Sequence, residues 1–190
     1  MARRIGIKQV QQIHGNRHSM SDRIKKTETK IDLERLRIET AKLLWDDKLQ
    51  KSNLQVSIQT DGADDWENST GSRIGVKESV WDKIHPALAG SWWETDFFPG
   101  LPWKVYRTRI MVMEGRRCYS IHTDDNARLH IAITTHNQAK FIFTTPPEIV
   151  HIPADGYVWW VDTRNEHTAI NASKDVRVHL LMSLVNTDAD

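Results

Sequence analysis

The sequence contains a single cysteine, no long hydrophobic run and almost no net charge. One cysteine, Cys118, permits no intramolecular disulfide and excludes a zinc site built from several cysteines. No apolar run approaches the roughly 18 residues that a membrane-spanning helix needs, and we expect no signal peptide because no apolar stretch follows the first charged residues. These absences predict a cytoplasmic protein without a membrane partner, with Cys118 as a small core residue.

The net charge of +1 hides an uneven distribution of charge along the chain. Residues 1–30 contain eight Lys and Arg residues, opposed only by Asp22 and Glu28. Such a segment can contact nucleic acid or a membrane surface, but a solvated chain end needs no such partner. We interpret residues 1–30 as a basic, flexible arm and expect no nucleic-acid partner. The sequence gives no indication of the oligomeric state.

Residues 31–190 are predicted to form one domain. Residues 31–90 are expected to be a helical lead-in, and about 105–185 a β-rich core. The apolar spacing over 32–50 is that of a helix, and Asp32 is placed to cap its first turn.

Short alternating segments separated by turn residues dominate the second half of the chain. Many short strands at regular spacing are typical of a sandwich or barrel, so the sequence predicts a mainly β protein with N-terminal helices. The expected strands are 54–60, 105–113, 118–124, 127–135, 139–145, 156–162, 167–171 and 176–185. Between the first two we expect a polar loop at 61–72, a short helix within 76–89 and an aromatic loop at 91–103.

His122 and Asp124 lie two residues apart in an expected strand, so their side chains point to the same face. We choose His167, which opens another expected strand, as a third ligand for a metal ion. Two histidines and one carboxylate on one face of a metal form the facial triad of non-haem Fe(II) oxygenases. A His-x-Asp pair arises readily by chance. The prediction therefore depends on its expected place within a sheet, where an unpaired carboxylate is costly.

Arg177 lies ten positions after His167, beyond a turn at "NASKD". We expect 167–171 and 176–185 to form a hairpin in which Ala169 pairs with Arg177, which places Arg177 about 7 Å from the metal ligand. A guanidinium there suits the recognition of a carboxylate by two parallel hydrogen bonds. A dicarboxylic co-substrate could bind the metal at one end and Arg177 at the other.

Four stretches resemble one family as an ordered set: "HTD" at 122–124, "ARLHIAITTHN" at 127–137, "GYVWWVDTRNEHTAIN" at 156–171 and "RVHLL" at 177–181. They are similar to the 2-oxoglutarate- and Fe(II)-dependent aspartyl/asparaginyl β-hydroxylase group. That group includes bacterial proline hydroxylase relatives and many phage-encoded members. The resemblance covers roughly residues 75–185.

The resemblance implies a double-stranded β-helix, which is a jelly roll of the cupin type. Arg177 is implied to bind 2-oxoglutarate. Similar proteins place an Arg-x-His strand beside the co-substrate, which implies that role for Arg128 and His130. The implied iron ligands are His122, Asp124 and His167.

The resemblance also implies an activity, which is hydroxylation of an amino-acid, peptide or protein side chain of the Asp, Asn or Pro type. Fe(II), 2-oxoglutarate and O₂ would be required, and oxoglutarate would be converted to succinate. Asp124 favours the proline-hydroxylase-like branch, because some aspartyl hydroxylases lack the acidic ligand. The same residue argues against halogenation, for which a small residue replaces the carboxylate.

Two other functions remain open on the sequence alone. A catalytically silent cupin-like binding module would have the fold without affinity for metal or oxoglutarate. A zinc hydrolase could use the same triad, and would need a general base such as Glu166 or Asp125. Arg107 and Arg109 share a face of an expected strand, where they could meet an anionic substrate group or pair with surface acids.

Overall fold

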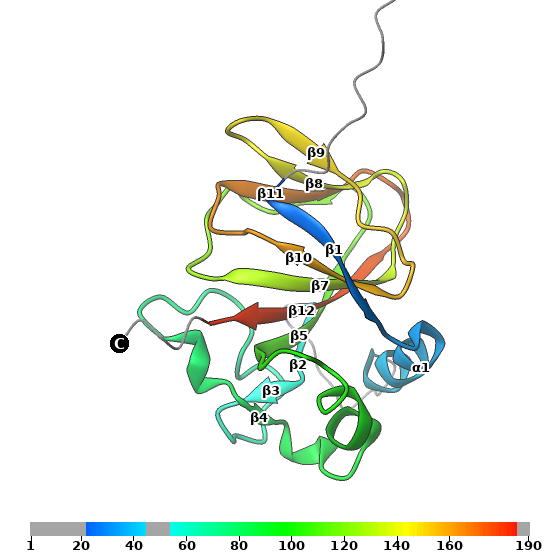
Figure 1. Ribbon diagram of the computed structural model, residues 1–190, viewed down its shortest axis with the longest axis vertical. Helices are drawn as coiled ribbons and strands as arrows, with labels where there is room; N and C mark the ends of the chain where they lie inside the picture. Colours follow the sequence, from blue (N-terminus) through cyan, green and yellow to red (C-terminus); the bar gives the residue numbers. More distant parts are fainter. Residues whose placement is uncertain (1–21, 45–53, 186–190) are drawn as a thin grey trace, which may run out of the picture.

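A computed structural model describes residues 22–44 and 54–185, which form two large antiparallel β-sheets, a two-stranded sheet of β3 and β4, one α-helix and three short helices (Figure 1). The strands are β1 (Ile24–Lys30), β2 (Gln55–Ser57), β3 (Gln59–Thr60), β4 (Lys83–Ile84), β5 (Tyr106–Met113), β6 (Arg117–Cys118), β7 (Ala127–Thr134), β8 (Ala139–Phe143), β9 (Glu148–Val150), β10 (Tyr157–Val161), β11 (His167–Asn171) and β12 (Arg177–Leu184). The six-stranded sheet has the order β1-β10-β7-β12-β5-β2, and the four-stranded sheet has the order β6-β11-β8-β9. The architecture is a double-stranded β-helix of the cupin type, which confirms the predicted fold class.

The alternation of side chains along the strands divides the core into two parts. Phe141 and Ala169 of the four-stranded sheet pack with Met113 and Ala132 of the six-stranded sheet, and together they fill part of the space between the sheets. The opposite face of the six-stranded sheet is covered by α1 (Leu33–Leu44) and by the segment that carries the short helices (Figure 1). The short helices are η1 (Glu78–Val80), η2 (Pro86–Leu88) and η3 (Trp93–Phe97). Both faces of the six-stranded sheet are thus buried, so any charged side chain on its inner face needs a partner.

Helix α1 begins where the sequence predicts. Asp32 Oδ1 accepts a hydrogen bond of 3.0 Å from the amide of Arg35, and this bond caps the first turn. Leu36 and Leu43 are buried on one face of the helix. Residues 45–50 of the predicted helix lie outside the described residues. In the described part of the chain, no helix is long and apolar enough to cross a membrane.

The segment between α1 and β5 is more finely divided than the sequence suggests. The strand expected at 54–60 is split into β2 and β3, which belong to different sheets. The short helix expected within 76–89 consists of η1 and η2 with β4 between them, and the aromatic loop at 91–103 contains η3. These elements have only two to five residues each, which is too short for a periodic pattern to reveal.

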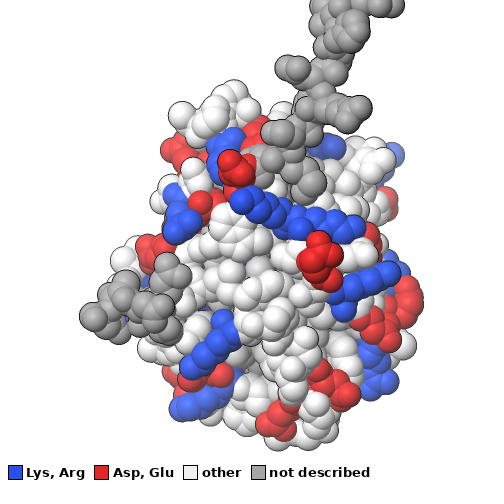
Figure 2. Space-filling view, viewed as in Figure 1, with Lys and Arg blue, Asp and Glu red and all other residues white. Residues whose placement is uncertain are grey.

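Residues 24–30, which the sequence places in the basic arm, form the edge strand β1 and pair with β10. Only Ile24 of this strand is buried, so no alternation of apolar residues marks it. Lys26 forms an ion pair of 2.8 Å with Asp155, and Figure 2 shows Lys and Arg side chains gathered along the path of β1. Lysines on an exposed edge strand discourage pairing with another chain. Residues 1–21 of the predicted arm lie outside the described residues.

The predicted hairpin of β11 and β12 is wrong. β11 pairs with β8 and β6, whereas β12 pairs with β5 and β7 in the other sheet. The turn between β11 and β12 therefore carries the chain from one sheet to the other. Asn171 holds this turn, because its Nδ2 donates to the carbonyl of Met113 at 3.2 Å and to that of Asp175 at 2.8 Å. Arg177 lies opposite Met113 and not opposite Ala169.

The strand expected at 118–124 is also wrong over most of its length. Only β6 and a single bridge between His122 and His167 have β pairing in this segment. Cys118 is exposed and is not a core residue, because β6 is a two-residue strand at the edge of its sheet. His122 and Asp124 thus lie at a sheet margin, not within a sheet as predicted.

Candidate metal centre

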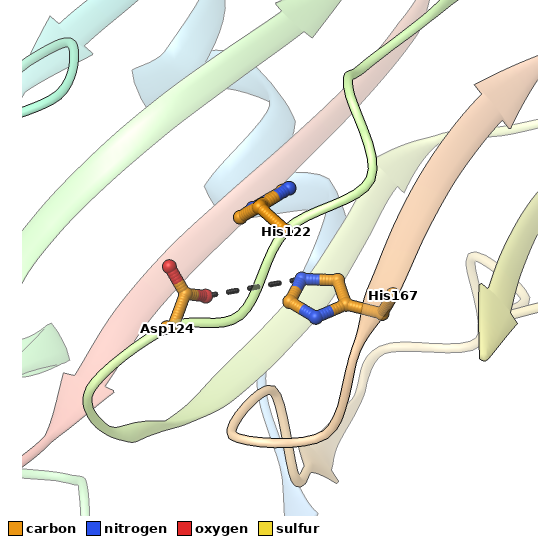
Figure 3. Close-up of side chains that lie close together, drawn as sticks. All are labelled: His122, Asp124 and His167. Carbon is orange, nitrogen blue, oxygen red and sulfur yellow. Dashed lines mark ion pairs between the residues drawn. The ribbon is translucent and has the colours of Figure 1, made fainter. Parts of the chain in front are cut away.

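His122, Asp124 and His167 converge although they do not share a strand (Figure 3). One ligand atom from each residue lies within 4.8 Å of the others. Asp124 Oδ2 is 3.9 Å from Nε2 of His167, and the two imidazole centroids are 4.5 Å apart. His167 is buried, Asp124 is half-buried and His122 is exposed, so the group opens to solvent on one side. The structure thus brings together the three residues that the sequence predicts as metal ligands.

Backbone hydrogen bonds place the three side chains. The amide of His122 donates to the carbonyl of His167 at 3.0 Å, and the reciprocal bond is 2.9 Å long. The amide of Asp124 donates to the carbonyl of Thr163 at 2.9 Å. These bonds fasten the irregular segment after β6 to the start of β11. The convergence therefore comes from pairing between distant segments and not from the two-residue spacing that suggested it.

Hydrogen bonds of Nδ1 leave Nε2 of both histidines available to a metal. Nδ1 of His122 lies 2.8 Å from the carbonyl oxygen of Ser120, and Nδ1 of His167 lies 2.9 Å from that of Asn165. A carbonyl oxygen can only accept, so each Nδ1 carries the hydrogen and each neutral ring keeps its lone pair on Nε2. Metal-binding histidines are oriented in this way by hydrogen bonds of the second ring nitrogen. Burial lowers the pKa of His167, which favours the neutral form that binds a metal.

Arg128 holds the carboxylate of the triad. Its Nη2 lies 3.0 Å from Oδ1 of Asp124, and its Nε donates to Oδ2 at 3.2 Å. Nη2 of Arg128 also lies 2.8 Å from Oε1 of Glu78, and Nη1 donates to Oγ of Ser183. Burial opposes ionisation of Asp124, but the attraction of Arg128 outweighs it and lowers the pKa of Asp124 to about 2. Asp124 is therefore a carboxylate at neutral pH.

Arg107 belongs to the same ion-pair network. Its Nη1 donates to Oε1 of Glu78 at 2.5 Å, and its Nε and Nη2 donate to the carbonyls of Ser69 and Gly71 at 2.9 and 2.6 Å. Arg107 thus fixes the loop that precedes η1, and it pairs with a buried acid, not with a surface acid as one interpretation of the sequence proposed. Sequence reasoning gave Glu78 no role, since nothing local shows that it contacts arginines 29 and 50 positions away.

A pocket of about 610 Å³ extends from the triad into the space between the sheets. Arg177 lines it and is 5% exposed. Its Nε donates to Nε2 of His179 at 3.1 Å, but no carboxylate of the described residues pairs with it. Burial lowers the pKa of Arg177 to about 10. A buried guanidinium without an acidic partner is costly, which makes it a natural site for an anionic ligand.

His130 lines the same pocket beside the metal-ligand group. Its ring is 3% exposed, and neither ring nitrogen has a hydrogen-bond partner among the described residues. Burial, followed by the nearby Arg177, holds the pKa of His130 well below its usual value, so the ring is neutral. A neutral imidazole offers one donor and one acceptor, and both are left for a ligand.

The two bases considered for a zinc hydrolase are placed differently. Glu166 is exposed, accepts a hydrogen bond from Thr144 and does not line the pocket. Asp125 lines the pocket but is exposed. Neither carboxylate is buried in the pocket beside the triad.

Comparison with known proteins gives similarity in structure only. No protein-family model matches the chain, and no curated protein is similar to it in sequence. AviO1 from Streptomyces viridochromogenes Tue57 superposes with a TM-score of 0.50 at 14% identity, over 83% of this chain and 86% of that protein. At this identity the similarity shows the fold alone.

Two further solved structures have lower scores. A truncated viral collagen prolyl hydroxylase from Paramecium Bursaria Chlorella virus-1 has a TM-score of 0.48 at 12% identity, over 92% of this chain and 99% of that one. A 2OG-Fe(II) oxygenase family protein from Burkholderia pseudomallei has a TM-score of 0.41 at 18% identity, over 68% of this chain. The chain spans 65% of that protein, just under two thirds of its length.

Proposed function

We propose that this protein is an Fe(II)- and 2-oxoglutarate-dependent hydroxylase. The observation that carries the proposal is that one pocket contains both the triad of His122, Asp124 and His167 and the side chain of Arg177. Arg177 is buried there and has no acidic partner among the described residues. The triad is a set of ligands for a divalent metal, and Arg177 is a receptor for a carboxylate. A co-substrate with a carboxylate at each end connects the two.

The residues fit a ferrous ion. Two imidazole nitrogens and one carboxylate oxygen converge with their lone pairs free, and the carboxylate is ionised at neutral pH. Three protein ligands leave positions open for a co-substrate and O₂. When bound, the iron supplies O₂ activation coupled to decarboxylation of oxoglutarate to succinate, while the protein provides position, charge and exclusion of water.

The roles of the pocket arginines follow from their partners. Arg177 holds the distal carboxylate of oxoglutarate, and the unpaired ring of His130 offers a hydrogen bond beside it. Arg128 was expected to contact the co-substrate. Its contacts with Asp124 and Glu78 instead support a positioning role, in which it orients the carboxylate ligand and keeps it ionised.

We infer that the substrate is an amino acid, a peptide or a protein side chain of the Asp, Asn or Pro type. The resemblance of the "HTD" and "ARLHIAITTHN" stretches to the hydroxylase group supports this class. The pocket of about 610 Å³ is large enough for oxoglutarate together with an amino-acid-sized group.

An anaerobic titration tests the proposal. Addition of Fe(II) and then oxoglutarate should produce the weak visible charge-transfer band of the chelated co-substrate, and the His167→Ala and Asp124→Ala variants should lose it. Arg117→Gln, an exposed arginine outside the pocket, is the matched control and should keep the band. Subsequent exposure to O₂ should release succinate. A wild-type protein that is folded but shows no band and no oxoglutarate binding would be a catalytically silent jelly-roll module.

A further inference from the structure

Arg109 is a second arginine of the pocket that lacks an acidic partner among the described residues. It is not part of the ion-pair network around Glu78, and the co-substrate is assigned to Arg177. Arg109 lies on β5, lines the pocket and is 6% exposed. Among the described residues, its hydrogen-bond partner is the neutral Gln55, whose Oε1 lies 3.3 Å from Nη1. Its Nε is buried without a partner. Burial and then the nearby Arg107 hold the pKa of Arg109 well below its usual value.

The other three buried arginines of the pocket have an anion assigned to them. Arg107 and Arg128 contact Glu78, Arg128 also contacts Asp124, and Arg177 awaits the co-substrate. Oxoglutarate brings one carboxylate to the metal and the other to Arg177, so loading the site brings no anion to Arg109. A buried, unpaired guanidinium is strongly unfavourable, which means that an anion is still missing from the occupied pocket.

The sheet register separates Arg109 from the co-substrate arginine. Arg109 lies opposite Leu181, and Leu181 lies opposite His130 on its other side, so Arg109 and His130 are in one row across three strands. Arg177 lies opposite Met113, four residues farther along β5. At about 3.4 Å per residue, the backbone positions of the two arginines are roughly 14 Å apart along the strands, although the Arg177 guanidinium extends along β12 to contact His179. Arg177 is assigned to the distal carboxylate of the co-substrate, so Arg109 is left without an anion.

The neutral partner of Arg109 also connects it to the pocket entrance. Gln55 Oε1 accepts from the amide of Gly71 at 3.2 Å as well as from Arg109. The segment that follows Gly71 lines the pocket and includes Ile74, which is 94% exposed. Gln55 therefore links Arg109 to an exposed segment that lines the same pocket.

We propose that Arg109 recognises a carboxylate of the substrate and so selects acidic substrates. This inference rests on the proposed function, because it takes the metal and oxoglutarate to occupy the rest of the pocket. The carboxylate could be the α-carboxylate of a free amino acid or the side chain of an acidic residue in a peptide. Bidentate pairing with a guanidinium is the same in both cases.

Calorimetry on the protein loaded with Mn(II) and oxoglutarate tests the proposal without turnover. The probes are a panel of free L-amino acids, each compared with its α-carboxamide, and an N-acetylated, C-amidated peptide that carries Asp, compared with the same peptide carrying Asn. At least one acid should bind about tenfold to a hundredfold more tightly than its amide, as expected for a charge-assisted bidentate pair. A preference among the free amino acids identifies an α-carboxylate, and a preference between the peptides identifies an acidic side chain.

The Arg109→Met variant should lose this preference, so that acid and amide bind within about threefold of each other. Arg109→Lys should keep part of the preference, because it retains the charge without the planar donors. Arg117→Gln is the control and should behave as the wild type. The melting temperature of Arg109→Met should not fall, because the substitution removes an uncompensated buried charge.

Two results would overturn the proposal. One is a wild-type protein that binds metal and oxoglutarate but prefers no acid over its amide. The other is an Arg109→Met protein that retains the preference. Failure of the proposed function looks different, since the wild type would then not bind oxoglutarate with metal at all. In that case acid and amide probes, compared by thermal shift on the metal-free protein, still decide whether Arg109 binds carboxylates.

Discussion

Asp124 and Arg128 form a two-point ion pair, with Nη2–Oδ1 and Nε–Oδ2 separations of 3.0 and 3.2 Å. The arginine thereby fixes the orientation of the carboxylate and lowers its pKa. Removing a residue that holds a metal ligand in this way typically lowers metal affinity by about tenfold to a hundredfold.

The Arg128→Met variant should therefore bind Fe(II) about tenfold to a hundredfold more weakly than the wild type. The triad itself is unchanged in this variant, so the loss would come from the freed carboxylate of Asp124. An anaerobic Fe(II) titration measures the effect, with Arg117→Gln as the control. Unchanged Fe(II) affinity in Arg128→Met would show that Arg128 does not position the ligand.

Arg177→Met should weaken oxoglutarate binding by about a hundredfold while leaving Fe(II) affinity unaltered. The reason is that Arg177 is buried in the pocket, is not one of the three metal ligands and has no acidic partner among the described residues. The measurement is an oxoglutarate titration of the iron-loaded protein, followed by turnover at low oxoglutarate. Full turnover at low oxoglutarate would contradict the assigned role.

Acid should destabilise the metal-free protein through Asp124. Its folded-state pKa of about 2 lies below its ordinary value of 3.8, so its contribution to stability is present above pH 3.8 and is lost as the pH falls towards 2. The size of this contribution is about 2 kcal/mol. Urea unfolding at several pH values, with a chelator present, measures it. Asp124→Asn should show a shallower loss of stability in this range, and an identical pH profile would contradict the prediction.

Asn171→Ala should lower the free energy of unfolding by about 2–3 kcal/mol, because it leaves buried carbonyls without a donor. Asn171 is fully buried, and its Nδ2 donates to the carbonyls of Met113, Glu114 and Asp175 at the turn between the sheets. Urea denaturation gives the value. Asn137→Ala, at an exposed turn, is the control and should change stability by less than about 0.5 kcal/mol. A loss in Asn171→Ala no larger than the control would show that these hydrogen bonds are dispensable.

The sequence alone determined the fold class and the residues of the candidate site. Alternation of apolar residues with period two marks a strand and its buried face wherever one face is packed, as in β8 and β11. The same rule missed β1, because a strand with one buried residue in seven carries no such pattern. The chemistry of His122, Asp124 and His167 was recognisable because these residue types in this order resemble a known set.

The tertiary structure decided which strands are partners, and with them the partners of every charged side chain in the pocket. Period two fixes the face of a residue but not its neighbour across the sheet, so the hairpin that was expected to bring Arg177 to His167 does not exist. Arg177 reaches the same pocket from the opposite sheet. The pairing of Arg128 with Glu78 and the isolation of Arg109 likewise depend on contacts between residues about 50 positions apart. Such contacts leave no local trace, because only packing brings these segments together.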